Sequence, residues 1–286
     1  MRPRFHTLVE VLAPHLPKGP AEVCPQTESA PEPEIPSKWA QSALGFTPDP
    51  KQQQVLDHDA HRLILCCSRQ WGKTTIIAIK ALHTAIHQPN SEIVVISRSL
   101  KQAGILIGRL CQSAATLGFP RKRVLGYEHS LQLPNGSRIF AIANSEKSSR
   151  GYTASIVIVD EAALVADEVI GTATPTLTRT NGKLWLLSTP NGQTGLFYNV
   201  WHDKELTNWC RVKATIEDCP FADKAFVDEQ RRLFPHNFRQ EFHCEFTPAK
   251  GRLLSRERIE AMIDPTIKHT PFPSLSDDLW QNPGRK

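Results

Sequence analysis

Apolar residues in this chain fall into short runs, and each run ends in small or polar side chains. Four of these runs are rich in aliphatic or β-branched residues and lie at 63–67, 92–97, 156–159 and 183–187. Runs of this length predict strands that are buried on both faces, as in a parallel sheet. Apolar residues at helical spacing follow two of them, after residue 73 and over 100–117. The pattern predicts a mainly parallel sheet flanked by helices, an α/β fold.

Shorter signals complete the expected set of elements. A Pro-Asn-Gly turn between two apolar segments predicts a hairpin over 131–143. Two prolines at 48 and 50 predict a turn, after which Gln52 opens a short helix. Further along, we expect a helix at 195–203, a strand at 209–216 and a charged, solvated helix at 226–234.

The first run leads into the segment LILCCSRQWGKTT, Leu63 to Thr75, which predicts a strand, a tight loop and a helix start. It fits the P-loop pattern GxxxxGK[ST] except that Cys67 replaces the first Gly. Free backbone N–H groups at such a helix start can hold phosphate oxygens. Lys73 is placed for the β- and γ-phosphates of ATP, and Thr74 for Mg²⁺. The predicted nucleotide-binding residues here are Cys67, Ser68, Arg69, Gln70, Trp71, Gly72, Lys73, Thr74 and Thr75. The alternative is a chance GKT at a helix start.

The run at 156–159 ends in two adjacent carboxylates, Asp160 and Glu161. Carboxylates are costly in a core, so they should emerge at the edge of the sheet. Asp160 would bind Mg²⁺, and Glu161 would orient the attacking water or accept its proton. The alternative is an ordinary strand end that carries acidic residues.

The run at 183–187 likewise delivers Ser188 and Thr189 to the end of a strand. Ligands of open α/β sheets bind at that edge, so either hydroxyl could contact the γ-phosphate and report its loss. A strand followed by a simple turn fits the same residues. Upstream, the amide of Gln52 could read the adenine edge with one donor and one acceptor. The alternative there is a helix face with three solvated glutamines.

Composition sets the domain organisation. The chain has 286 residues, and many of its 22 prolines lie within residues 1–40, which we expect to form a loosely ordered arm with one short helix at 5–12. Residues 41–246 form the predicted ATPase domain. Residues 247–286 form a Pro-rich tail with one helix at 255–263.

Charge and cysteine content exclude several classes. Seven cysteines without a CxxC pair argue against a disulfide framework or a zinc site, and favour a reducing cytosol. The net charge of +5 is compatible with a polyanionic partner but does not require one. No apolar run approaches the length of a membrane span, and the first residues do not form the apolar core that a signal peptide needs, so we expect a soluble protein.

The order of five segments resembles the ATPase domain of the large terminase subunit of tailed bacteriophages, over residues 45–246. The segments are GFTPDPKQ, CCSRQWGKTT, SRGYTASIVIVDEAA, LLSTPNGQTGLFYNVW and FRQEFHCEF. In that family the loop reads SRQxGKT and often lacks the first Gly, so Cys67 is no obstacle. The resemblance implies a P-loop NTPase of the additional-strand, RecA-like class, in which the third strand lies between the other two.

By the same resemblance, Gln52 matches the adenine-contacting glutamine, and Arg69 matches the arginine that senses the γ-phosphate. Lys73 and Thr74 match the phosphate and Mg²⁺ residues, and Asp160 and Glu161 match the metal ligand and the catalytic carboxylate. The coupling motif matches Ser188, Thr189 and Pro190.

The implied activity is an ATPase motor that drives double-stranded DNA into a procapsid, with ATP and Mg²⁺. The implied partners are DNA, a portal protein, a small terminase subunit and further copies in a ring on the portal, in the host cytoplasm. Family members usually continue into a nuclease domain. Since only 40 residues follow Phe246, and their acids follow no apolar strand, we expect no nuclease activity from this chain.

Two other functions compete with the motor. A superfamily-2 helicase-like, DNA-dependent ATPase would share the loop and the acidic pair, but it requires a second RecA-like lobe. A decayed fragment that binds ATP without moving DNA would have lost a key side chain, and none is missing.

Overall fold

The structure is a computed structural model, which describes residues 34–145, 151–248 and 262. From residue 35 onward, the described residues belong to one compact unit. The helices predicted at 5–12 and 255–263 fall outside the described residues, except for Met262. No helix of the described part is long and apolar enough to cross a membrane.

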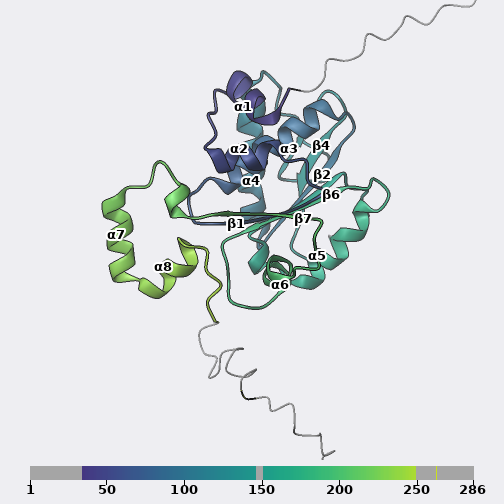
Figure 1. The fold of residues 1–286 in the computed structure, drawn as a ribbon. Coiled ribbons are helices and arrows are strands. Elements are labelled where there is room, and N and C mark those ends of the chain that lie inside the picture. The colour runs from purple at the N-terminus through teal and green to yellow at the C-terminus, as the bar shows by residue number, and fades with distance from the viewer. Residues whose placement is uncertain (1–33, 146–150, 249–261, 263–286) are drawn as a thin grey trace, which may run out of the picture. The chain divides into compact units, whose positions relative to one another are not determined.

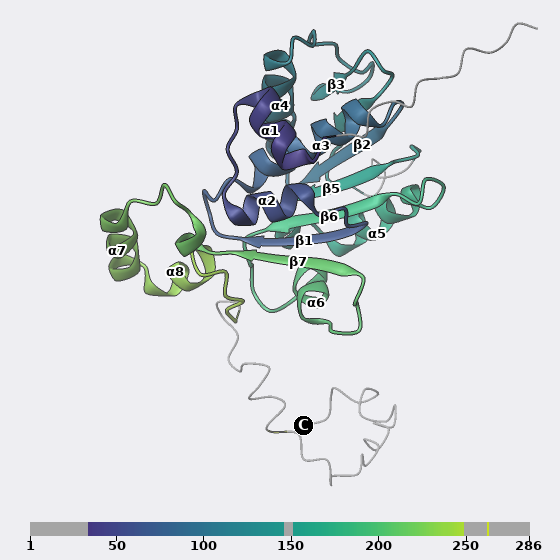
Figure 2. The ribbon, with the colours of Figure 1, turned by 45° about the horizontal axis from the view of Figure 1, so that its top comes forward.

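Seven strands form a single sheet in the described part of the chain (Figures 1 and 2). Their order is β3-β4-β2-β5-β6-β1-β7, and every neighbouring pair is parallel except β3 and β4. The predicted mainly parallel sheet and the hairpin are confirmed. The strands are β1 (Arg62–Cys67), β2 (Glu92–Ser97), β3 (Ser130–Gln132), β4 (Arg138–Ala141), β5 (Ile156–Asp160), β6 (Lys183–Ser188) and β7 (Trp209–Ala214).

Helices cover both faces of this sheet. The first four are α1 (Pro36–Leu44), α2 (Pro50–Asp57), α3 (Lys73–His87) and α4 (Leu100–Thr116), and they pack on one face. The opposite face carries α5 (Asp167–Ala173), α6 (Leu196–His202) and the short 3-10 turn Ala162–Leu164. The last two helices, α7 (Lys224–Leu233) and α8 (Pro235–Glu241), stand beside the sheet, and α7 buries no residue (Figure 1). Two further 3-10 turns span Thr174–Leu177 and Ile216–Asp218.

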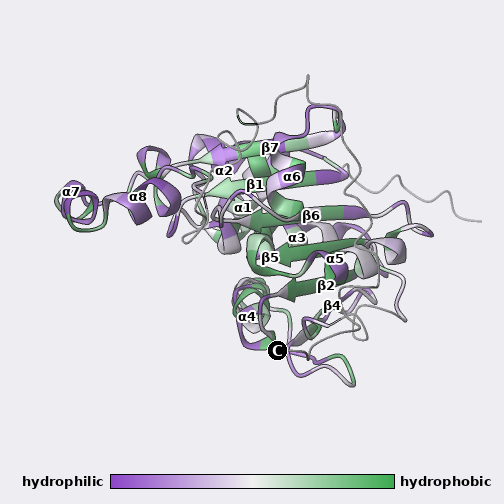
Figure 3. Cartoon of the chain, turned by 90° about the horizontal axis from the view of Figure 1, so that it is seen from below, coloured by the Kyte–Doolittle hydropathy of each residue, from purple (hydrophilic) through white to green (hydrophobic). Residues whose placement is uncertain are grey.

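Alternation along each strand divides the apolar core between the two faces. In β1, Leu63 and Leu65 pack with α1 to α4, whereas Ile64 and Cys66 pack with α5 and α6. All these side chains are fully buried, and the central strands and α3 are hydrophobic along most of their length (Figure 3). A strand buried on both faces must be apolar at every position, which explains the continuous runs in the sequence.

The strand order places the three chemical motifs at one edge. β6 lies between β5 and β1, as the resemblance implied, with Ser188 beside Cys66 and Leu187 beside Asp160. Because all three strands are parallel, their polar ends emerge together at the carboxyl edge of the sheet.

Three local expectations need correction. Helix α1 starts at Pro36, inside the range predicted as a loose arm, because Trp39 and Ala40 bury their side chains in the core under the sheet. Helix α2 starts at Pro50 and not at Gln52, since Asp49 caps it and proline is favourable at the first helical position. Helices α5 and α8 have no counterpart in the predicted elements.

Candidate active site

The loop between β1 and α3 has an unusual backbone. Gln70 and Gly72 have positive φ angles of 62° and 100°, and α3 then starts at Lys73. Only glycine adopts such angles freely, so Gly72 fits its place, while Gln70 is a strained residue of the kind found at functional sites. The loop turns so that the helix start, with its free N–H groups, lies at the carboxyl edge of the sheet.

Cys67 occupies the position of the missing first glycine. It is the last residue of β1, is fully buried, and is not among the residues with positive φ. This backbone therefore does not require glycine there. Burial raises the pKa of the Cys67 thiol well above its ordinary value, so the side chain stays neutral and packs as an apolar group.

Lys73 lies in the first turn of α3, and its Nζ is 2.9 Å from Oε1 of Glu161. Burial acts to lower the pKa of Lys73, but the negative charges of Glu161 and Asp160 outweigh it, and the pKa is raised. The ammonium group is therefore charged, nearly buried and held by a carboxylate that another anion can replace.

Asp160 ends β5 and is buried. Burial raises the pKa of its carboxyl to about 6, against the opposing effects of Lys73, the backbone N–H of Glu161 and a hydrogen bond from Thr74. The Thr74 hydroxyl therefore lies close enough to the Asp160 carboxyl to lower its pKa through a hydrogen bond. Two oxygen ligands from adjacent strand and helix ends suit Mg²⁺, which binds proteins through one or two carboxylates together with water and phosphate.

Glu161 adopts the left-handed conformation, with φ 54°. Its side chain contacts Lys73 on one side and accepts a long hydrogen bond of 3.4 Å from Oγ of Ser188 on the other. A non-glycine residue in this conformation costs free energy, so the surrounding contacts must hold it there. In this conformation the carboxylate lies next to Ser188, at the end of β6.

Arg69 contacts helix α8. Its backbone N–H donates to the carbonyl oxygen of Glu241 at 2.9 Å, and its Nε donates to Oε2 of the same residue at 2.5 Å. The side chain of Arg69 is two-thirds exposed, at 67%. This partner, 172 residues away, was not predicted. The family resemblance assigns Arg69 to the γ-phosphate, and the alternative is that Arg69 anchors the fold of the P-loop itself.

Gln52 is engaged within the protein at both ends of its amide. Oε1 accepts from the backbone N–H of Asp49 at 3.1 Å, and Nε2 donates to the carbonyl of Trp71 at 3.0 Å. The first bond closes a capping box at the start of α2, and the second ties α2 to the P-loop. Adenine contact by Gln52 stays a prediction, and it would require these bonds to be exchanged.

A cavity of about 340 Å³ opens at this edge of the sheet. Of the predicted site residues, it is lined by Arg69, Gln70, Lys73, Glu161, Thr189 and Pro190. Ser188 and Asp160 lie beneath them, buried. The remaining lining residues were not predicted, namely Arg98, Gln102, Leu164, Asn191, Gln240 and Glu241. Arg98 and Gln102 directly follow the polar end of β2, so the rule that ligands bind at strand ends could have found them.

Several buried polar atoms around the loop lack hydrogen-bond partners among the described residues. They are Oγ of Ser68, Nε1 of Trp71 and Oε1 of Gln102. Such atoms are unusual in a folded protein and mark places where a ligand or water completes the bonding. Together with Lys73 and the free helix start, they fit a triphosphate nucleotide as substrate, and Thr74 with Asp160 fit its Mg²⁺.

A strand, loop and helix that present a lysine and a hydroxyl, opposite an Asp-Glu pair two strands away, define the class of P-loop ATPases with an inserted strand. The described residues include no cluster of three or more His, Cys, Asp or Glu side chains that could hold a metal ion alone.

Comparison with known proteins gives the family. The model of the family "Terminase large subunit, T4likevirus-type, N-terminal" matches residues 64–261, and the chain belongs to this family. The large terminase subunit of Escherichia phage T5 is 30% identical over 224 residues, covering 73% of this chain and 50% of that protein. This chain spans about half the length of the curated relatives it matches.

Solved structures agree on the fold. The ATPase domain of the large terminase of Thermus phage P74-26 matches with a TM-score of 0.65 at 23% identity, covering 74% of this chain and 99% of that domain. The large terminase of a thermophilic bacteriophage, solved in complex with ADP, matches with a TM-score of 0.62 at 18% identity, covering 70% of this chain and 53% of that protein.

Proposed function

We propose that this chain is the ATPase motor of viral DNA packaging, which hydrolyses ATP to move double-stranded DNA into a procapsid. The observation that carries the proposal is the cluster formed by Lys73, Thr74, Asp160 and Glu161, of which Lys73 and Glu161 line one cavity. A lysine, a threonine hydroxyl and two carboxylates are the groups that phosphoryl transfer uses, and the chain belongs to a family of large terminase subunits.

Nucleotide binding starts with an exchange of partners. Lys73 holds Glu161 in this structure, and the β- and γ-phosphates of ATP would take over that ammonium group. Glu161 would then be free to orient the attacking water and accept its proton. The ion pair thereby keeps the lysine charged and the base inactive until the substrate arrives.

Three hydroxyls have distinct roles in this proposal. Thr74 would hold Mg²⁺ together with Asp160, and the metal would neutralise charge on the phosphates. Ser188 contacts Glu161, so its hydroxyl would respond when that carboxylate moves. Thr189 and the following Pro190 line the cavity, where they would sense the γ-phosphate and pass its loss along the chain.

Arg69 would change partners in the same way. Its guanidinium group, now on Glu241, lines the cavity and can stabilise charge on the transferred phosphoryl group. Release of Glu241 would loosen the side-chain link between the P-loop and α8, while the backbone bond from Arg69 N–H could remain. We infer that α8 follows the state of the nucleotide through this arginine.

The proposed partners follow from the packaging role. They are double-stranded DNA, a portal protein, a small terminase subunit and further copies of the chain in a ring, in the cytoplasm of the host. We expect no DNA cleavage by this chain, because two-metal cleavage needs several carboxylates around paired ions, and Asp160 and Glu161 serve the nucleotide.

ATP hydrolysis by the purified chain tests the proposal. Phosphate release is measured alone, with duplex DNA and with a candidate portal protein, and Lys73→Ala serves as the control. We expect slow turnover that the DNA or the portal stimulates and that the variant lacks. Turnover that survives Lys73→Ala, or none under any condition, would contradict the proposal.

Two side assays separate competing activities. Strand displacement from a partial duplex would favour a helicase. Supercoiled plasmid incubated with Mg²⁺ or Mn²⁺ should stay intact. Nicking that persists in Lys73→Ala would reveal a nuclease centre outside the ATP site.

A further inference from the structure

One stretch of the chain has a strong excess of positive charge. Residues 93–127 contain no aspartate or glutamate, although the chain has 29 of them. The same stretch contains six cations, which we call the basic stripe: Arg98, Lys101, Arg109, Arg121, Lys122 and Arg123. All six residues are exposed.

Within the described part of the chain, none of the six side chains takes part in an ion pair. The nearest acid along the chain after the stretch is Glu128, which lies 3.8 Å from His129 and is mostly exposed. Unpaired surface cations in this number leave a positive field that attracts a polyanion.

The six cations lie along one helix and the segments that flank it. Arg98 lies two residues before α4, Lys101 and Arg109 lie in its first turn and its middle, and the run 121–123 lies beside its later half. Arg121 and Arg123 both act electrostatically on Cys111 of α4, which fixes that proximity. Helix α4 packs over β2, β3 and β4, at the far end of the sheet from β7 (Figure 2). Seventeen helical residues span about 25 Å.

We propose that the basic stripe contacts the phosphate backbone of duplex DNA, an inference that rests on the proposed packaging function. A duplex presents about one negative charge per 1.7 Å of its axis, so a track of this length faces many phosphates. The stripe starts at the nucleotide cavity, because Arg98, just before α4, and Gln102, in the first turn of α4, line that cavity. Helix α4 therefore connects DNA bound on the stripe with the site of ATP hydrolysis.

The aromatic residues favour duplex over single-stranded DNA. Proteins that hold single strands stack the bases on exposed aromatic rings. The stretch has two aromatic residues, Phe119 and Tyr127, and both are partly buried. Phe119 packs against the core under α4, and the ring of Tyr127 lies 4.0 Å from that of Phe140. Neither ring is free for a base, whereas backbone contact needs only the cations.

Salt dependence of DNA binding tests the inference. The triple variant Arg121→Ala, Lys122→Ala, Arg123→Ala is compared with a control triple of exposed cations elsewhere, Lys38→Ala, Arg179→Ala and Lys204→Ala. Both triples remove three of the 34 Lys and Arg residues, so the net charge falls from +5 to +2 in each. The probe is a fluorescent duplex of about 30 base pairs, titrated over a salt series by anisotropy.

We expect the stripe triple to bind the duplex about tenfold to hundredfold more weakly, and its log–log salt slope to fall by about 2 to 3. The control triple should lose much less, and Arg109→Ala should lower the slope by about 1. DNA should no longer stimulate the ATPase of the stripe triple, while its rate without DNA stays at the wild-type value.

Two results would overturn the inference. One is equal affinity and slope in the two triples. The other is a larger loss for a single strand of the same length than for the duplex. Failure of the proposed function is distinguishable, because it would remove ATP hydrolysis from the wild-type chain in the absence of DNA.

Discussion

Two lysines on helix α3 have pKa values that are shifted in opposite directions. Lys73 and Lys80 are two turns apart, and both are largely buried. Burial lowers the pKa of each, but at Lys73 the carboxylates Glu161 and Asp160 reverse the effect. At Lys80 burial prevails, with added repulsion from Lys183, and the pKa falls from 10.5 to about 8. The same side chain on the same helix is therefore set to two different states by its neighbours.

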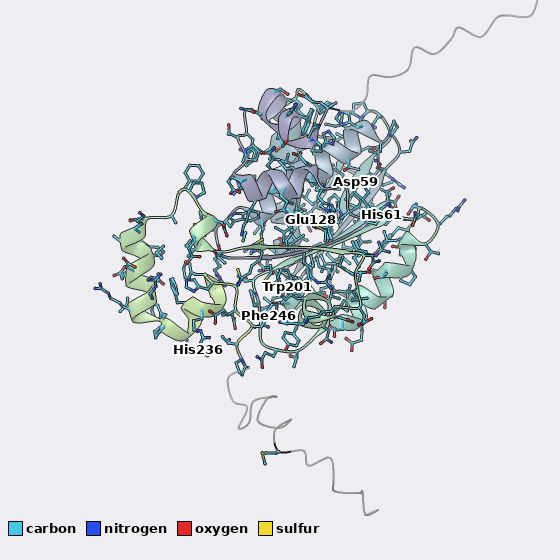
Figure 4. All side chains as sticks on the ribbon, viewed as in Figure 1. Asp59, His61, Glu128, Trp201, His236 and Phe246 are labelled. Atoms are coloured by element: carbon cyan, nitrogen blue, oxygen red, sulfur yellow. The ribbon has the colours of Figure 1, made fainter. Side chains whose placement is uncertain are left out.

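The partners explain the difference. Lys80 donates to the backbone carbonyls of Leu56 and His58, at 2.7 and 2.8 Å, and so closes the end of α2. It lies toward the amino ends of the strands, where Asp59 and His61 are labelled in Figure 4, on the side away from α7 and α8. Lys73 holds a side-chain anion at the opposite edge. A carboxylate can be exchanged for a phosphate, whereas a helix end cannot, so we propose that Lys73 serves the substrate and Lys80 serves the fold.

The largest effect should come from removing the exchangeable lysine. Lys73→Ala takes the cation from the phosphates in both the bound state and the transition state, so we expect kcat/KM for ATP to fall by about 10³-fold or more. Nucleotide binding measures the loss of affinity for ATP, and phosphate release measures the loss of turnover. Normal turnover in this variant would mean that Lys73, like Lys80, is only structural.

Arg69 extends the comparison, because its partner is also a carboxylate. Arg69→Ala should lower kcat by about 10³-fold and leave ATP affinity largely intact, since the charge it supplies acts on the transferred phosphoryl group. Glu241→Gln removes the competing anion without touching Arg69, and should weaken the effect of nucleotide on α8. Loss of ATP affinity together with turnover would count against a catalytic role for Arg69. Protease protection of the α7–α8 segment, with and without nucleotide, reports the change.

Substitutions of Glu161 and Asp160 should distinguish the catalytic base from the metal ligand. Glu161→Gln keeps the size of the side chain but cannot accept a proton, so we expect a loss of about 10²- to 10³-fold in kcat with Mg²⁺ and ATP still bound. Asp160→Asn should instead raise the Mg²⁺ concentration needed for nucleotide binding. Metal titrations of both variants check this. An equal Mg²⁺ requirement in the two would contradict the assignment.

The smallest effect concerns the structural lysine and appears in its pH dependence. Between pH 8 and 10.5 the unfolded chain binds more protons at Lys80 than the folded protein does, so this residue makes the free energy of unfolding rise with pH across that window. Lys80→Met lacks this contribution. Urea unfolding of both proteins at pH 7 and pH 10 should show the difference between them growing by about 1 to 3 kcal/mol in favour of wild type. A constant difference would mean that the pKa of Lys80 is ordinary.

Much of this site was predictable because its chemistry sits at the ends of apolar strands. The runs before Cys67, Asp160 and Ser188 are long enough to identify buried parallel strands, and one edge then collects their polar ends. The contact between Arg69 and Glu241 could not be predicted. Helix α8 buries one residue, Phe238, so its pattern gives no sign of where it packs.

The backbone conformation of Glu161 could not be predicted from the sequence either. Nothing in the letters around Glu161 indicates a left-handed residue, since that angle is imposed by contacts with Lys73 and Ser188 from other elements. The sequence suggests an adenine contact for Gln52 because its amide offers a donor and an acceptor. The same two groups can equally bind backbone atoms. Only the folded structure shows that Asp49 and Trp71 already use them.

The strand order has a consequence for how the chain acquires its shape. Both neighbours of β1, namely β6 and β7, are made more than a hundred residues after it. During synthesis β1 therefore has no partner strand on either edge until β6 and β7 have been made. Unpaired strand edges are sites of mispairing and aggregation. Closing such distant pairs is slow, because the long intervening loop must first be ordered. The nucleotide loop is encoded early and completed late, so a nascent chain should gain no ATP-binding site until β6 has left the ribosome.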